Sequence, residues 1–181
     1  MAAAAPSAAA APFPSLVVFD LDWTLWPLDV DTDVSPPFRA APSGNVADAR
    51  GAACALYPDT RAVLARAAAG GARVAFASRT TDPAAAEALL VAHGLWAALG
   101  GERALFQAYP SGGGGAAKTR HFAALFAATG AAPADTLFFD DMRDNIDVAA
   151  RAGVTCVRVD GAGVTLAALE RGLAAWRAAR R

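Results

Sequence analysis

The chain has 181 residues, of which 55% are hydrophobic, and its formal net charge is −1. This length fits one ordinary domain, and the near-neutral charge excludes a global field that would favour nucleic acid or an anionic membrane. Alanine inflates the apolar fraction, so the core must rest on the larger Leu, Val, Phe and Trp side chains. Because no run of about 18 apolar residues is free of a break, we expect no membrane span.

Residues 1–14 are almost entirely Ala, Pro and Ser and cannot build an apolar core, so we expect a disordered tail. The tail lacks the basic residues of a secretory signal and the Arg that is common in organelle transit peptides. The two cysteines, Cys54 and Cys156, lie far apart without a CxxC motif, which favours free thiols in a reducing compartment. These features predict a cytoplasmic protein, with organelle import through residues 1–14 as the alternative.

The first structured segment is the short apolar run Leu16–Phe19, which predicts a strand buried on both faces. Asp20 and Asp22 follow it, at the strand end where open α/β sheets place their ligands. Two carboxylates ~4 Å apart repel by about 4 kcal/mol at an effective dielectric of about 20, so a proton, a basic side chain or a metal ion must offset the repulsion. An all-oxygen site suits Mg²⁺. The simpler alternative is a polar turn in which Asp22 caps a helix.

The rest of the chain alternates predicted helices with predicted strands. Turn residues fill the segment 26–57, which we expect to form a small flap or hairpin. Caps and terminal glycines place helices at about 58–69, 82–93, 118–130, 144–152 and 165–179. Apolar runs place four more strands at 73–77, 104–107, 136–139 and 154–159. This alternation predicts a three-layer Rossmann-like α/β fold over 15–181, a parallel sheet with helices on both faces and no large cap domain.

Polar residues follow four of the predicted strands. Because the carboxyl ends of parallel strands meet at one edge of a sheet, we expect these side chains to converge. Acids, one lysine and one hydroxyl together suit metal-assisted phosphoryl transfer, in which a carboxylate can be the nucleophile that forms an aspartyl-phosphate. The residues are Asp20, Asp22, Ser78, Arg79, Thr80, Lys118, Asp140 and Asp141.

Four of these segments resemble, in order, the four motifs of the haloacid dehalogenase superfamily. Asp20–Leu25 resembles motif I, Ser78 motif II, Lys118 motif III and Asp140–Asp141 motif IV. The resemblance covers about residues 15–175, and further short matches narrow it to the magnesium-dependent phosphatase-1 subgroup. These matches are Asp22–Pro27, Val30–Thr32, Pro36–Phe38, Leu56–Pro58, Ala77–Thr80, Tyr109–Pro110, His121–Phe122 and Phe138–Asp141.

The resemblance implies a Mg²⁺-dependent phosphatase that hydrolyses phosphate monoesters. Asp20 would be the nucleophile and a metal ligand. Asp22 would protonate the leaving oxygen and then activate water, which requires a raised pKa, while its backbone carbonyl would reach the metal. Ser78 and Lys118 would bind the phosphate, and Arg79 would hold the substrate beside it.

Motif IV offers two registers for the metal-binding acid. Asp141 is followed four residues later by Asn145 and then by the aliphatic Ile146, which is the family's pattern. Asp140 precedes Asp144 by the same spacing, but no aliphatic residue follows Asp144. We therefore expect Asp141 to bind the metal, with Asp140 as the alternative.

Two features depart from the subgroup: Gly112–Gly115 lengthens the loop before Lys118, and Asp29 stands where relatives carry an aromatic residue. The short flap predicts an open site that suits a large partner such as a protein phosphotyrosine, with aryl phosphates, sugar phosphates and phosphorylated glycation adducts as other substrates. A catalytically weak phosphoprotein-binding domain is the alternative function. A phosphotransferase or dehalogenase on the same scaffold is a further one. We expect a monomer.

Overall fold

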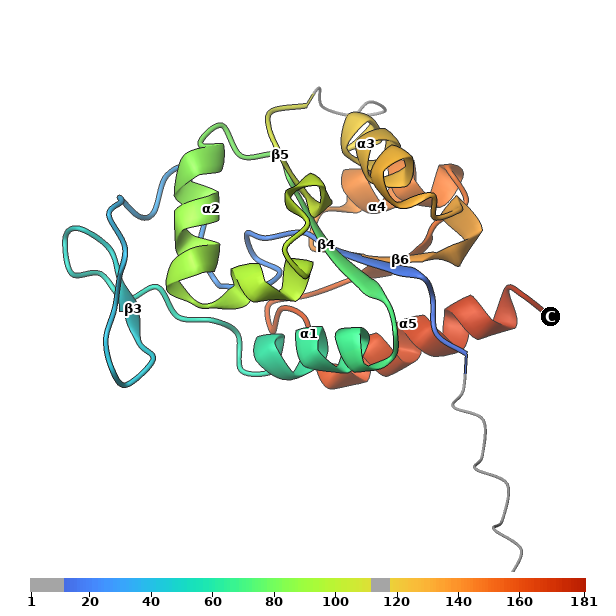
Figure 1. Ribbon diagram of the computed structural model, residues 1–181, viewed down its shortest axis with the longest axis horizontal. Helices are drawn as coiled ribbons and strands as arrows, with labels where there is room; N and C mark the ends of the chain where they lie inside the picture. The colour runs from blue at the N-terminus through green and yellow to red at the C-terminus, as the bar shows by residue number, and fades with distance from the viewer. Residues whose placement is uncertain (1–11, 112–117) are drawn as a thin grey trace, which may run out of the picture.

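The computed structural model describes residues 12–111 and 118–181. Its centre is a five-stranded sheet with the order β5–β4–β1–β6–β7, in which every neighbouring pair is parallel (Figure 1). The strands are β1 (Leu16–Phe19), β4 (Arg73–Ser78), β5 (Phe106–Ala108), β6 (Thr136–Asp140) and β7 (Thr155–Arg158). The predicted parallel α/β sheet is therefore confirmed.

β1 is the central strand, and all four of its side chains are fully buried. It pairs with β4 on one side and β6 on the other, so that Val18 lies between Ala75 and Phe138. The rings of Phe19 and Phe139 stack with their centroids 5.2 Å apart. A strand covered on both faces needs a continuous apolar run, which is the pattern seen in its sequence.

Helices cover both faces of the sheet, as predicted. α1 and α5 lie together on one face, and α3 and α4 lie together on the other (Figure 1). Within the described residues, no helix is long and apolar enough to cross a membrane. The helices are α1 (Thr60–Ala69), α2 (Pro83–Ala92), α3 (Thr119–Thr129), α4 (Arg143–Arg151) and α5 (Leu166–Ala178).

The flap predicted over 26–57 contains a small antiparallel pair, β2 (Arg39–Ala40) and β3 (Val46–Ala47). Figure 1 shows this pair projecting beyond α2, away from the sheet. Asp48 anchors its base, because the buried carboxylate accepts hydrogen bonds from the backbone N–H groups of Ser35, Arg50 and Ala52 at 2.8–3.1 Å. The flap is thus held as a defined structure although its strands are short.

Two segments differ from the sequence-based expectation. The strand expected over 104–107 begins only at Phe106, because Arg103–Leu105 form a 3₁₀ turn, in keeping with the weak strand preference of Ala104. Of the tail expected over 1–14, Phe13 packs against Gly70 and lies 5.2 Å from the guanidinium of Arg66. Residues 1–11 of this tail and the Gly112–Gly115 loop lie outside the described residues.

Candidate active site

A pocket of about 150 Å³ opens at the carboxyl edge of the sheet, where β1, β4 and β6 end. The structure brings seven of the eight residues that were expected to converge to its wall, and the eighth, Asp140, is fully buried and bonded to one of them, Lys118. The seven are Asp20, Asp22, Ser78, Arg79, Thr80, Lys118 and Asp141. The convergence expected from the strand ends is therefore observed.

Lys118 is the centre of the charge network. Its Nζ lies 2.5 Å from Asp20 Oδ1, 2.6 Å from Asp140 Oδ2 and 2.6 Å from the carbonyl oxygen of Ala77. Burial lowers the pKa of Lys118, but the neighbouring charges of Asp140 and Asp20 outweigh it and hold the pKa above its ordinary value. The side chain is therefore an ammonium group, only 1% exposed, whose three N–H groups are directed to these three oxygens and whose positive charge lies at the pocket.

The backbone is strained at this site. Trp23 and Lys118 are the two non-glycine residues of the described chain with positive φ, at 55° and 53°. Both line the pocket. Left-handed backbone is unfavourable for such side chains and persists where surrounding contacts hold it, commonly at functional sites.

Both carboxylate oxygens of Asp140 accept hydrogen bonds from other residues of the protein. Its Oδ1 accepts hydrogen bonds from the backbone N–H of Met142 at 2.7 Å and from Asn145 Nδ2 at 3.0 Å. Its Oδ2 accepts from Lys118 and, at 2.9 Å, from Asn145 again. Sequence reasoning used Asn145 only to choose the motif IV register, yet this residue also lies 3.5 Å from Arg79 Nη1 through its Oδ1. Asn145 therefore joins Asp140 to Arg79 in the wall of the pocket.

Three carboxylates fit a metal ion here, because one oxygen from each of Asp20, Asp140 and Asp141 lies within 4.8 Å of the others. With Lys118 they carry a formal charge of −2, which a divalent cation would neutralise, and oxygen ligands suit Mg²⁺. Burial raises the pKa of Asp20, against the opposing effect of Lys118, and burial and the Asp140 charge raise that of Asp141. The Asp141 carboxylate lines the pocket and accepts no hydrogen bond from another described residue.

Asp22 has the protonation behaviour that an acid–base catalyst needs. Burial raises its pKa to about 7, although the indole N–H of Trp26 donates to Oδ1 at 2.8 Å and opposes the rise. The charges of Asp29 and Asp31 add to the rise. At neutral pH this carboxyl group exists in both protonation states, so it can give up a proton and take one back.

The loop after β4 presents Ser78 to the pocket. The backbone N–H of Thr80 donates to Ser78 Oγ at 3.1 Å, so the hydroxyl hydrogen points elsewhere and has no acceptor among the described residues. Asp31 of the flap holds this loop, since its carboxylate accepts from Thr80 Oγ1 at 2.5 Å and from the backbone N–H groups of Thr81 and Asp82 at 2.9 and 3.2 Å. Sequence reasoning missed this role of Asp31, which no local pattern indicates.

His121 also holds the loop that follows β4, through contacts with backbone carbonyl groups. Its Nε2 lies 2.8 Å from the carbonyl oxygen of Ser78 and 3.1 Å from that of Tyr109. Two carbonyl oxygens require a donor, so the proton of the neutral ring is on Nε2. Burial lowers the pKa of His121 to about 4, which keeps the ring uncharged at neutral pH. His121 is therefore a positioning residue.

Solved structures show the same architecture. A HAD-superfamily hydrolase from Ehrlichia chaffeensis aligns with a TM-score of 0.61 at 11% identity, covering 95% of this chain and all of that chain. A putative HAD-like phosphatase from Mesorhizobium loti aligns with a TM-score of 0.54 at 14% identity, covering 93% and 88%. At such low identity the likeness concerns the fold alone, which is that of the haloacid dehalogenase superfamily.

Sequence comparison is more specific. The model of the Acid Phosphatase family matches residues 12–179. Magnesium-dependent phosphatase 1 of Homo sapiens is 39% identical over 160 residues, covering 88% of this chain and 85% of the human protein. The chain therefore belongs to the acid phosphatase family, and within it to the group of magnesium-dependent phosphatase 1. This confirms the resemblance seen in the four motifs.

Proposed function

We propose that this protein is a Mg²⁺-dependent phosphatase that hydrolyses phosphate monoesters through an aspartyl-phosphate on Asp20. One observation carries the proposal. Asp20 and Asp22 line the same pocket as the Lys118 ammonium group and the Ser78 hydroxyl. A nucleophile, an acid, a positive charge and a hydroxyl donor for the phosphate thus lie within one small site. The name of the human relative supports the magnesium dependence.

The carboxylates of Asp20 and Asp141 would hold the ion, together with the backbone carbonyl of Asp22. Asp140 would support them through its bonds to Lys118 and Asn145. When bound, Mg²⁺ supplies positive charge that reduces the repulsion between the Asp20 carboxylate and the phosphate oxygens.

In the first step, an oxygen of Asp20 attacks phosphorus and the bond from phosphorus to the ester oxygen breaks. The leaving oxygen keeps the electron pair and takes a proton from Asp22. Ser78 donates a hydrogen bond to a phosphate oxygen, and the positive charge of Lys118 attracts the phosphate. Arg79, whose Nε is buried without a partner among the described residues, binds substrate beside them.

In the second step, water attacks the phosphorus of the aspartyl-phosphate while Asp22 takes a proton from that water. The bond from phosphorus to the Asp20 oxygen breaks, which restores the carboxylate and releases phosphate. Asp22 thereby returns to its protonated form. A pKa of about 7 suits Asp22 both as the acid of the first step and as the base of the second, because neither proton transfer is strongly unfavourable at neutral pH.

An aryl phosphate is the substrate class that we favour, with protein phosphotyrosine as its macromolecular form. Trp23 is 45% exposed at the mouth of the pocket. An adjoining cleft shares Trp23 and Asp141 with the active site and is also lined by Tyr57 and Arg158. An aromatic leaving group can stack on the indole there. Sugar phosphates and phosphorylated glycation adducts are the alternative substrates, and a comparison of kcat/KM decides among them.

The direct test is phosphate release from para-nitrophenyl phosphate in Mg²⁺ and in EDTA. We expect release by the native protein in Mg²⁺, almost none in EDTA, and none by Asp20→Asn. Asp147→Asn, which changes an acid on α4 whose side chain is 48% exposed, is the matched control and should retain activity. Full Mg²⁺-dependent turnover by Asp20→Asn would overturn the proposed nucleophile. Tight phosphopeptide binding without any release would support the phosphoprotein-binding alternative instead.

The intermediate has its own test. Asp22→Asn should retain some attack on an aryl phosphate, whose phenolate leaves without a proton, but should lose activation of water. A phosphorylated protein should then accumulate, and hydroxylamine should release its phosphate. Absence of protein-bound phosphate at every quench time, despite a burst of nitrophenolate, would contradict the aspartyl-phosphate.

A further inference from the structure

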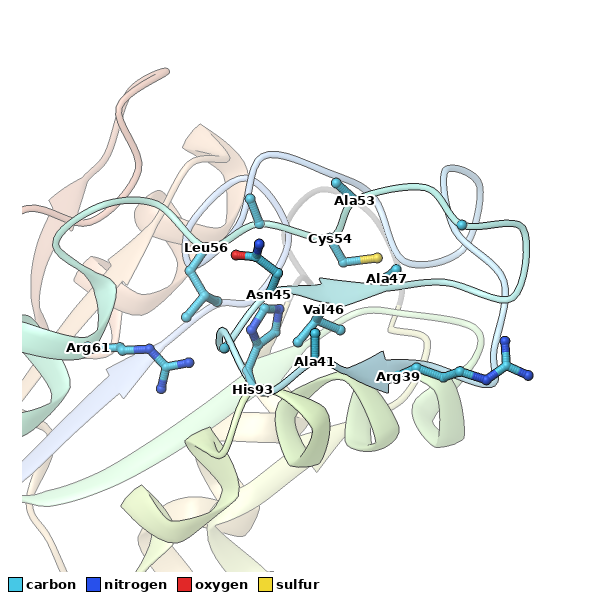
Figure 2. Close-up of a pocket in the computed structure, with 13 residues that line it drawn as sticks. Arg39, Ala41, Asn45, Val46, Ala47, Ala53, Cys54, Leu56, Arg61 and His93 are labelled. Carbon is cyan, nitrogen blue, oxygen red and sulfur yellow. The ribbon is translucent and has the colours of Figure 1, made fainter.

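A second, larger pocket of about 510 Å³ lies between the β2–β3 hairpin, α1 and the end of α2 (Figure 2). It shares no lining residue with the active-site pocket. Its volume lies within the range of about 300–1,000 Å³ that is typical of small-molecule sites. The catalytic steps proposed above make no use of it.

His93 is the unusual residue of this second pocket. It is only 5% exposed, and neither ring nitrogen has a hydrogen-bond partner among the described residues. A buried polar group without a partner destabilises the folded protein, so its presence calls for a reason. The ring packs on Trp26, with the two centroids 6.2 Å apart. Figure 2 shows the imidazole directed into the pocket beside Asn45.

The charge around His93 is positive. Arg61 of α1 is exposed, extends its guanidinium towards the same space in Figure 2 and forms no ion pair with any described residue. Arg39 also lines the pocket, but its guanidinium points away from the centre. No acidic residue lines this pocket. Burial and the charge of Arg61 lower the pKa of His93 to about 4, although a nearby backbone group of Cys54 opposes the shift. The ring is therefore neutral, with one N–H donor and one acceptor nitrogen.

Apart from these residues and Asn45, the wall is built from apolar and small side chains, which leaves space for an apolar ligand body. Val46 and Leu56 are the largest of them, and the others are Ala41, Gly44, Ala47, Gly51, Ala53, Cys54 and Ala55. One inward guanidinium and one neutral imidazole match a group with a single negative charge. A planar carboxylate also suits the forked geometry of the guanidinium.

We propose that this pocket binds a small carboxylic acid with an apolar body. Its carboxylate accepts hydrogen bonds from Arg61 and from the N–H of His93, and its apolar part lies on Val46 and Leu56. The site is independent of the proposed catalytic function. Trp26 lies between the two pockets, because its ring packs on His93 and its indole N–H donates to Asp22.

The two histidines make the test direct, since the chain contains only His93 and His121. We would record the imidazole proton NMR signals of untagged full-length protein, assigned with His93→Gln, during titration with benzoate, phenylacetate and 3-phenylpropionate. The amide of each acid serves as its neutral control, and inorganic phosphate tests the other anion. His121 lies by the active site and reports binding there.

We expect at least one carboxylate to shift the His93 signals saturably and to raise the pKa of His93. Its amide and Arg61→Gln should each weaken binding by about tenfold, the effect of about 1.4 kcal/mol. Arg171→Gln, which removes the same charge from an exposed position on α5, should bind as the native protein does.

Three results would overturn the proposal. The first is no shift of His93 with any of the acids at about 10 mM, a concentration that detects even millimolar affinity. The second is equal binding by Arg61→Gln, or of the amides. The third is inorganic phosphate binding more tightly than every carboxylate, which would replace the assigned ligand class.

Discussion

The adjacent acids Asp140 and Asp141 should respond in opposite ways to the same substitution. In Asp140→Asn one carboxylate oxygen becomes an NH₂ group, which cannot accept a hydrogen bond. Whichever way the amide is turned, it faces a donor, either Lys118 Nζ or the backbone N–H of Met142. Breaking a buried ion pair on one side costs about 3–5 kcal/mol. We therefore expect the free energy of unfolding to fall by about that amount in EDTA.

Asp141→Asn should leave the fold intact. Burial and the Asp140 charge raise the pKa of Asp141, so the folded state disfavours the carboxylate relative to the unfolded state. A carboxyl group with a raised pKa loses stability as pH rises through its titration, so it lowers stability at pH 7. Removing it should leave the free energy of unfolding in EDTA unchanged or higher. The same variant should lose Mg²⁺ binding, because it lacks a proposed ligand.

Urea unfolding at pH 7, in EDTA and in millimolar Mg²⁺, separates these effects. A metal that binds only the native state stabilises it by RT ln(1 + [L]/Kd), so the native protein should gain stability in Mg²⁺ and Asp141→Asn should gain none. A loss of stability in EDTA by Asp141→Asn as large as that of Asp140→Asn would refute the different roles assigned to the two acids. Full retention of the Mg²⁺-dependent gain by Asp141→Asn would refute the choice of ligand.

Four further predictions follow from single contacts. Trp26→Phe removes the hydrogen-bond donor that lowers the pKa of Asp22. For a bond worth about 1.5 kcal/mol, the limb of the pH profile of kcat/KM that reports Asp22 should move to higher pH by about one unit. An unmoved limb would contradict the assignment of that limb to Asp22. Asp31→Ala releases the loop after β4 and should lower kcat/KM by roughly tenfold, about 1.4 kcal/mol, with Mg²⁺ affinity unchanged by calorimetry. Gly172→Ala places a Cβ 2.9 Å from two side chains of the sheet and should cost about 1–3 kcal/mol in urea unfolding without loss of activity. The pKa of His93 is about 4 in the folded protein, against about 6.5 for a histidine in the unfolded chain. The free energy of unfolding should therefore fall as the pH decreases from about 6.5 to about 4. In His93→Gln the slope of the free energy of unfolding against pH should be smaller over this range, by up to about 1.4 kcal/mol per pH unit.

Much of the fold and of the site follows from local pattern. Apolar runs such as Leu16–Phe19 have no stable place except inside a sheet covered on both faces, so their positions and the alternation with helices were predictable. The carboxyl ends of parallel strands share one edge, so the convergence of Asp20, Ser78 and Lys118 was predictable too. The expected cytoplasmic location and monomeric state stay predictions.

Tertiary structure alone decided what each polar side chain contacts. Asp140 and Asp141 are neighbours in sequence, yet the Asp140 carboxylate is fully hydrogen-bonded to protein donors while Asp141 lines the pocket. The difference arises because successive residues at a strand end point in different directions. Asp31 reaches a loop some 50 residues further along the chain, and His93 is enclosed by a hairpin that precedes it. Sequence periodicity records whether a residue is buried or exposed. It holds no information on which distant groups share its surroundings, and those groups determine charge, pKa and binding.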